Sequence, residues 1–117
     1  MPSVTEIRLE RATQMLVVAF DDGATFRLSA EYLRVESPSA EVQGHGPDQH
    51  VLVAGKAGVR ITTIEPVGHY AVRLIFDDGH DSGLFSWDWL HTLGTEQDQR
   101  WAAYEAGLKK AGKSRAG

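Results

Sequence analysis

One sequence pattern occurs twice in this chain, and it constrains the fold more than any other feature. The first copy runs from Phe20-Asp-Asp-Gly23 to Leu28-Ser-Ala-Glu-Tyr-Leu33. The second runs from Phe76-Asp-Asp-Gly79 to Phe85-Ser-Trp-Asp-Trp-Leu90, with one residue inserted. Asp-Gly favours a tight hairpin in which both central residues have positive φ, and serine is a strong helix N-cap. Each copy therefore predicts a strand, a turn, a second strand and a short helix.

The residues around the two copies complete this plan. Apolar and β-branched residues indicate strands at 7–9, 15–20, 24–28, 51–53, 59–67, 70–76 and 80–85. Short helices are expected at 30–35 and from Ser86 to Leu90 or beyond. Because two copies are too few for a solenoid, we predict the α+β class. The expected fold is a β-rich single domain of two pseudo-repeated hairpin-plus-short-helix units with a C-terminal helix.

The C-terminal helix is expected to begin at Thr95-Glu-Gln-Asp98, which resembles a capping box. A stripe at helical spacing follows, made of Trp101, Tyr104 and Leu108. This stripe should face the core. The last segment mixes basic residues with Gly, Ala and Ser. We therefore predict one domain over residues 1–110 and a flexible basic tail over 111–117.

Composition narrows the possible classes of function. The 117 residues fit one domain, and 12 basic against 16 acidic residues give a net charge of −4, which repels nucleic acid. The chain has no cysteine, which excludes disulfides, a thiol nucleophile and thiolate-bound metals. Its apolar runs are shorter than the roughly 20 residues of a membrane span, and no signal segment is visible. We expect a cytoplasmic protein that binds neither nucleic acid nor membrane.

The residues that could carry catalysis have simpler explanations. Asp21-Asp22 and Asp77-Asp78 are paired carboxylates, but the predicted hairpin turns account for them. His80-Asp81-Ser82 holds the residue types of a hydrolase triad, yet neighbours in a strand point to opposite faces. The chain has no phosphate loop, no Gly-x-Ser-x-Gly and no His-Glu-x-x-His. We therefore expect no enzyme activity.

Histidines and tryptophans are the remaining candidate binding groups. No standard metal motif is formed by four of the five histidines, His45, His50, His69 and His80. Trp87 and Trp89 lie two apart on an expected helix, about 200° around its axis. One of them should therefore be buried and the other partly exposed. The exposed one is a candidate contact residue, because tryptophan is enriched in interface hot spots.

Four segments of the chain combine into a family resemblance. They are Glu31-Tyr-Leu-Arg-Val-Glu-Ser-Pro-Ser-Ala-Glu-Val-Gln-Gly-His-Gly46, Ile64-Glu-Pro-Val-Gly-His-Tyr-Ala-Val72, Phe76-Asp-Asp-Gly-His-Asp-Ser-Gly83 and Trp87-Asp-Trp-Leu90. Together they resemble the small bacterial gamma-butyrobetaine hydroxylase N-terminal-like family, over roughly residues 4 to 93. The namesake enzymes carry a separate oxygenase domain that uses iron and 2-oxoglutarate. Because this chain has no counterpart of that domain, the resemblance does not imply oxygenase activity.

The resemblance also implies where a zinc site has been lost. In the related enzymes, three cysteines after a Leu-Arg pair and one later histidine hold a structural zinc. Here Leu33-Arg34 is retained, but the cysteine positions are taken by Ser37, Ser39 and Val42, while the histidine position is His80. Hydroxyl and isopropyl groups do not replace thiolates as zinc ligands. The resemblance therefore implies a degenerate metal site and no cofactor.

The function expected from these observations is a noncatalytic protein-binding or adaptor domain of unknown pathway, with another protein as its partner. The family is also similar to a C-terminal segment of some iron-sulfur carrier ATPases of the Mrp type, which favours a recognition module. The expected partner surface consists of Arg34, Ser37, Ser39, Glu41, His45, Trp87 and Trp89. The alternative is a metal-binding accessory protein for an oxygenase or iron-sulfur cluster pathway. That role needs His80 together with His45, His50 or nearby carboxylates.

Overall fold

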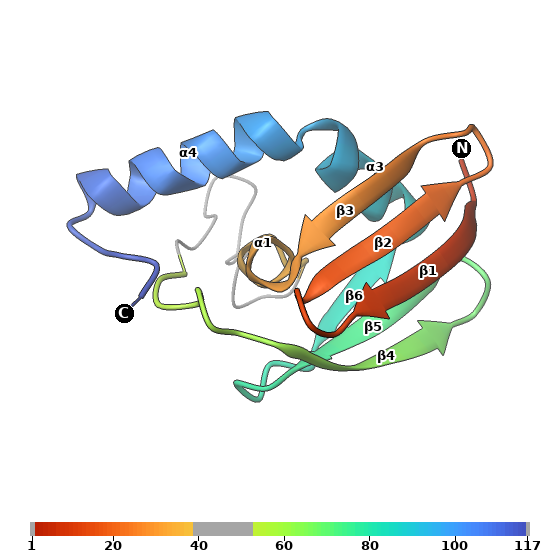
Figure 1. Ribbon diagram of the computed structural model, residues 1–117, viewed down its shortest axis with the longest axis horizontal. Helices are drawn as coiled ribbons and strands as arrows, with labels where there is room; N and C mark the ends of the chain where they lie inside the picture. Colours follow the sequence, from red (N-terminus) through yellow and green to blue (C-terminus); the bar gives the residue numbers. More distant parts are fainter. Residues whose placement is uncertain (1, 39–52, 117) are drawn as a thin grey trace.

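Two hairpin units follow one another along the chain, and each is a three-stranded antiparallel sheet followed by a helix (Figure 1). The computed structural model describes residues 2–38 and 53–116. The first unit comprises β1 (Val4–Glu10), β2 (Met15–Phe20), β3 (Thr25–Ser29) and α1 (Ala30–Val35). The second comprises β4 (Ile61–Val67), β5 (Ala71–Phe76), β6 (Gly83–Ser86) and α3 (Trp87–Thr95), and α4 (Gln97–Lys110) follows. The predicted α+β class and the repeated plan are confirmed.

The two hairpin loops after β2 and β5 share one geometry. In each, the glycine N–H donates to the carbonyl three residues earlier, at 3.1 Å for Gly23 and 3.2 Å for Gly79. Only the glycines have positive φ, 90° in both loops, so the prediction of two positive-φ residues was wrong. The loops have three residues instead of two, because a type I turn is followed by a left-handed glycine. The carboxylates of Asp22 and Asp78 accept the backbone N–H two residues later.

A serine begins the helix of each unit, as the sequence predicted. The Ser29 hydroxyl accepts from the backbone N–H of Tyr32 at 3.0 Å, and the Ser86 hydroxyl accepts from that of Trp89 at 3.1 Å. Each interaction satisfies one of the helix N–H groups that have no partner within the helix. β6 begins at Gly83, later than expected, and it pairs with β5 in regular register from Gly83 opposite Leu74 to Ser86 opposite Ala71.

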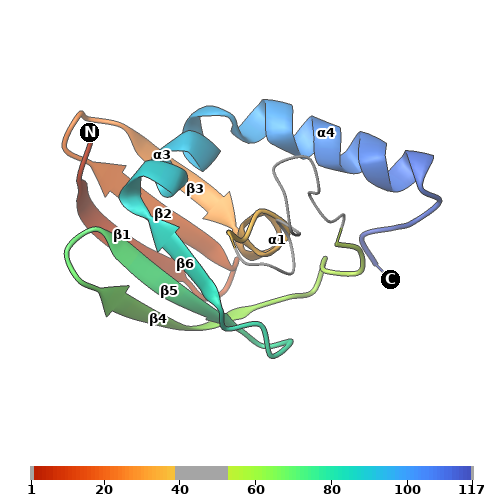
Figure 2. The same cartoon turned by 180° about the vertical axis from the view of Figure 1, so that it is seen from behind.

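The two sheets share one apolar core with α1 and α3. Fully buried side chains come from both units and include Leu16, Leu28, Tyr32, Leu33, Leu74, Phe76, Phe85, Leu90 and Leu93. Within this core, the Tyr32 hydroxyl donates to the backbone carbonyl of Leu93 at 2.7 Å, which joins the two helices. Figure 2 shows the same arrangement from behind, with α3 leading into α4. Neither unit buries this apolar surface alone, so the pair forms one domain.

The C-terminal helix α4 packs as expected but begins differently. Tyr104 and Leu108 are buried against Val35 of α1, and Trp101 is half-buried beside them. The predicted capping box at Thr95 was wrong, because Thr95 still belongs to α3 and its hydroxyl donates to the carbonyl of Thr92. Glu96 is the only residue between the two helices. It takes the cap position, but its side chain accepts no capping hydrogen bond from the backbone of α4.

The segment after α4 returns to the body of the protein. The carbonyls of Ser114 and Arg115 accept from the N–H groups of Gly55 and Ala57 at 3.1 and 3.0 Å. The Arg115 guanidinium also binds the carboxylate of Glu31. The sequence predicted a flexible tail here and did not indicate these contacts. The strand expected at 51–53 lies mostly outside the described residues. No described helix is long and apolar enough to cross a membrane.

Candidate functional site

The turn of each unit contacts the helix of the other unit. Asp22 in the first turn lies 2.9 Å from Nε2 of His91 in α3. Asp78 in the second turn accepts a hydrogen bond from Nε of Arg34 in α1 at 2.8 Å. Arg34 and His91 occupy the same position in the two copies of the sequence pattern. The paired aspartates therefore form the turns and also interlock the units, a role that sequence reasoning missed because it treated each turn by itself.

Asp78 has the richer set of donors. Besides Arg34, the ammonium of Lys56 lies 2.6 Å from the same carboxylate oxygen, and the backbone N–H of His80 donates to the other at 3.1 Å. Burial by itself raises the pKa of the Asp78 carboxyl. The hydrogen bonds from Lys56, His80 and Arg34 outweigh burial and lower this pKa to about 2. Asp78 is therefore ionised at neutral pH and is a weak base there.

Ser37 and His80 lie side by side next to this cluster. The Ser37 hydroxyl and Nε2 of His80 are 2.9 Å apart, and both side chains are buried. Gly83 is needed opposite Ser37, because an added Cβ there would overlap the Ser37 hydroxyl. Arg34, Ser37 and His80, three of the residues singled out from the sequence, are thus brought together by packing. Their common position is at the junction of the two units.

The fit of this junction to a zinc ion is poor. The structure describes Ser37 and His80 of the four degenerate positions, and these two are hydrogen-bonded to each other. A hydroxyl and one imidazole supply none of the thiolates that such a site uses. No group of three or more possible metal ligands occurs among residues 2–38 and 53–116. Ser39, Glu41, Val42, His45 and His50 lie outside the described residues.

Both tryptophans of α3 are half-buried, so the prediction that one ring is buried and only the other partly exposed was wrong for the buried one. The reason is that each indole is anchored to a different neighbour. The Trp89 N–H donates to the carbonyl of Glu36 at 3.0 Å, and the Arg100 guanidinium lies 4.9 Å from its ring centroid. The Trp87 N–H donates to the carbonyl of His69 at 2.7 Å. Trp89 therefore serves the fold, while Trp87 reaches the surface.

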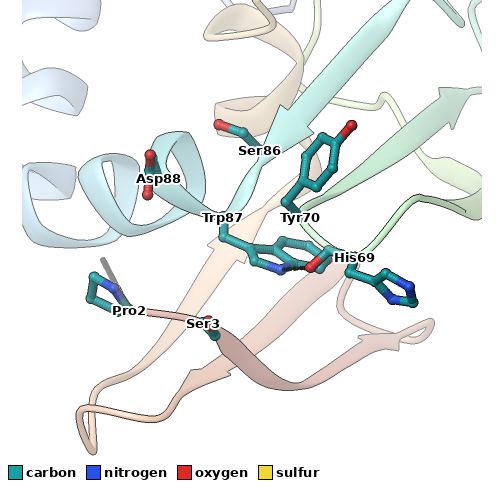
Figure 3. Close-up of a pocket in the computed structure, with 7 residues that line it drawn as sticks. All are labelled: Pro2, Ser3, His69, Tyr70, Ser86, Trp87 and Asp88. Carbon is teal, nitrogen blue, oxygen red and sulfur yellow. Dashed lines mark hydrogen bonds between the residues drawn. The ribbon is translucent and has the colours of Figure 1, made fainter.

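A hollow of about 370 Å³ lies over Trp87, and we call it the Trp87 pocket. Its lining consists of Pro2, Ser3, His69, Tyr70, Ser86, Trp87 and Asp88. In Figure 3, the Trp87 ring lies between Tyr70 and Ser3, and Asp88 lies on the side of Trp87 away from Tyr70. Tyr70 is 68% exposed, which is unusual for so large a ring. Sequence reasoning made Tyr70 the first residue of a strand, whereas β5 begins at Ala71. The position of Tyr70 directly after a predicted turn was the available signal.

The residues of the predicted partner surface do not lie together on one exposed face. Arg34 and Ser37 are buried, at 3% and 0% exposure, and offer no contact area in this conformation. Trp89 is covered in part by Arg100. Trp87 is the one of these four residues that lines the pocket. It lies there with two residues that the sequence did not single out, Tyr70 and Asp88.

The sequence of both units matches the model of one protein family. The family model described as gamma-butyrobetaine hydroxylase-like, N-terminal, matches residues 7–91, which include both hairpins and most of α3. The chain belongs to this family. In this gamma-butyrobetaine hydroxylase-like N-terminal domain, the matched region therefore holds the interlocked turns, the Ser37–His80 pair and most of the Trp87 pocket. No curated protein matches the domain.

Solved structures share the fold of this gamma-butyrobetaine hydroxylase-like N-terminal domain. Two solution NMR structures are 52% and 51% identical, with TM-scores of 0.84 and 0.85. The alignments cover 98% of this chain and 90% and 86% of the other chains. A crystal structure of a protein of unknown function from the DUF971 family of Acidithiobacillus ferrooxidans is 40% identical, with a TM-score of 0.67. That alignment covers 79% of this chain and 92% of the other.

Proposed function

We propose that this chain is a noncatalytic protein-binding domain whose contact surface is the Trp87 pocket. The observation that carries the proposal is the 68% exposed ring of Tyr70 beside the half-buried indole of Trp87. Aromatic rings supply large contact area and are enriched at the centres of protein interfaces. A partner that covers Tyr70 removes its apolar surface from water. The Trp87 ring is already fixed by its hydrogen bond to His69 and loses little freedom on binding.

The noncatalytic part of the proposal is supported by how the buried titratable groups are used. The carboxylate of Asp78 binds Arg34, Lys56 and the His80 N–H, and its low pKa keeps it ionised. Nε2 of His80 is engaged by the Ser37 hydroxyl. A general acid or base needs a pKa near the working pH and access to a substrate. These groups hold the two units together instead.

The experiment that tests the proposal is site-specific photo-crosslinking of the full chain in its host cell. A photoreactive phenylalanine derivative replaces Ser3, which is exposed and lines the pocket. The control places the same group at Lys109, an exposed residue near the end of α4. A second sample combines the probe at Ser3 with Tyr70→Ser. Because Tyr70 is mostly exposed, this change should not unfold the domain.

We expect one defined crosslinked protein with the probe at Ser3, none with the probe at Lys109, and loss of the product in the Tyr70→Ser sample. Circular dichroism should show that all three samples are folded. The proposal is wrong if the probes at Ser3 and Lys109 give the same products, or if the product persists without the Tyr70 ring.

A further inference from the structure

Each unit carries a carboxylate at the same position of its helix, and the two carboxylates differ in their ion-pair partners. Glu31 and Asp88 occupy the second position of α1 and of α3, directly after equivalent residues of the repeated pattern. The preceding residues are Ala30, which is buried, and Trp87, which is half-buried at the surface. A small residue in the first unit is thus replaced by a large ring in the second. The ring of Trp87 is one of the groups that line the Trp87 pocket.

In the first unit, the carboxylate binds an arginine of the same chain. The Arg115 guanidinium donates two hydrogen bonds to Glu31, at 2.8 and 2.7 Å, and Glu31 is 6% exposed. The same guanidinium carbon lies 5.2 Å from the ring centroid of Trp101. Two parallel hydrogen bonds and an aromatic face are the arrangement that suits the planar arginine head group. The chain therefore contains a working example of this contact.

In the second unit, the equivalent acid has no such partner. Asp88 is exposed, and no ion pair joins it to a cation in the part of the chain that the structure describes. Asp88 is one of the lining residues of the pocket, as are Trp87 and Tyr70 (Figure 3). An acid in the first turn of a helix also stabilises the helix. Helix stabilisation does not account for the two aromatic rings beside it.

We propose that the Trp87 pocket binds an arginine side chain of a partner protein, with Asp88 as the ion-pair partner and the rings of Trp87 and Tyr70 as the stacking surface. This inference rests on the proposed protein-binding function. The charge of the site fits the occupant, since the pocket offers a carboxylate and the chain carries a net charge of −4. Arginine is favoured over lysine, because a guanidinium both stacks on rings and binds a carboxylate through two hydrogen bonds.

The closing experiment is an NMR titration of the full chain with blocked tripeptides. The probe is acetyl-Gly-Arg-Gly-amide, and its matched control is acetyl-Gly-citrulline-Gly-amide, which has nearly the same shape and no charge. The reporter is the indole N–H resonance of Trp87, assigned from a Trp87→Phe sample. We expect the arginine peptide to shift this resonance in a saturable way. The citrulline peptide should bind at least tenfold more weakly, because it lacks the charge that strengthens such hydrogen bonds.

Two aspartate variants separate binding from helix stability. Asp88→Asn removes the charge in the first turn of α3, and Asp98→Asn removes the equivalent charge in the first turn of α4. We expect Asp88→Asn to weaken the arginine peptide about tenfold and Asp98→Asn to leave its affinity unchanged. Equal binding of arginine and citrulline peptides, or unchanged affinity in Asp88→Asn, overturns the arginine assignment. A crosslinked partner at Ser3 that survives Asp88→Asn also contradicts it, while the protein-binding function stands.

Discussion

The guanidinium of Arg34 lies 2.8 Å from the carboxylate of Asp78, which ties the helix of the first unit to the turn of the second. The His91–Asp22 contact is its counterpart in the opposite direction. The two contacts differ in burial, because the Arg34 side chain is 3% exposed and that of His91 is 24% exposed. The Arg34–Asp78 contact is therefore the more buried of the two contacts that join the units.

Asp78 should make the stability of the domain depend on pH in the acid range. Its pKa of about 2 in the folded protein is below the ordinary value of 3.8. A depressed folded pKa contributes stability that is present above the unfolded pKa and is lost as pH falls towards the folded one. We expect Asp78→Asn to cost about 1–2 kcal/mol at pH 5, less than full linkage because water screens the exposed part of the carboxylate.

Urea unfolding at several pH values measures this effect. The difference between the natural chain and Asp78→Asn should shrink between pH 4 and pH 2, and Asp98→Asn controls for the loss of one exposed charge. A difference that stays constant over this range contradicts the assignment of a low pKa to Asp78.

The hydrogen bond between Ser37 and His80 should stabilise the fold. Ser37→Ala leaves the buried His80 ring without this partner, and we expect a loss of about 1–2 kcal/mol in the free energy of unfolding. Ser82→Ala, at an exposed position nearby, is the matched control and should change stability by less than about 0.5 kcal/mol. Equal losses of unfolding free energy in the two variants would show that this hydrogen bond does not stabilise the fold.

Replacing Gly94 in α3 by alanine should destabilise the domain, although alanine usually stabilises a helix relative to glycine. Alanine is favoured over glycine by about 1 kcal/mol in helix interiors, but a Cβ at Gly94 would overlap the ring of Phe26. We expect Gly94→Ala to destabilise the domain by about 1–3 kcal/mol, as overpacking does. Thermal unfolding measures this, and Phe26→Ala in the same chain should relieve the overlap. Gly58→Ala, with open space around its Cβ, is the control.

Arg115 should hold the C-terminal segment and shield a buried carboxylate. Arg115→Gln leaves Glu31, which is 6% exposed, without its two hydrogen bonds from the guanidinium. Leaving a buried charge without its partner is costly, and since the Arg115 side chain is 47% exposed we expect about 1–3 kcal/mol. Lys113→Gln removes an exposed charge nearby as control. Hydrogen exchange at the Gly55 and Ala57 amides should rise in Arg115→Gln alone, and unchanged exchange contradicts the docking of this segment.

Metal content is the direct check on the degenerate zinc site. We expect untagged protein, purified without chelator, to be folded and to contain far less than one metal ion per chain by elemental mass spectrometry. The physical reason is that Ser37 and His80 bind each other and provide no thiolate. A stoichiometric metal that is lost in His80→Ala would reverse this conclusion and favour the metal-binding accessory role.

The sequence by itself determined the local structure of both units. Asp-Gly pairs placed the turns and Ser29 and Ser86 placed the helix starts, because these preferences depend on a few neighbouring residues. The α1 helix has the predicted bounds of Ala30 and Val35. The same reasoning failed at Thr95, since a capping pattern is meaningful only where the preceding helix has already ended.

Only the tertiary structure decided how the units meet. The Arg34–Asp78 contact joins residues 44 apart in the chain, and the Arg115–Glu31 contact joins residues 84 apart. Likewise, Trp87 and Tyr70 line one pocket because the backbone N–H of Trp87 donates to the carbonyl of Tyr70 at 2.8 Å. Sequence periodicity reports which face of an element is buried, but not which element covers it. That choice comes from packing two similar units around one core, where small differences between the copies fix each contact.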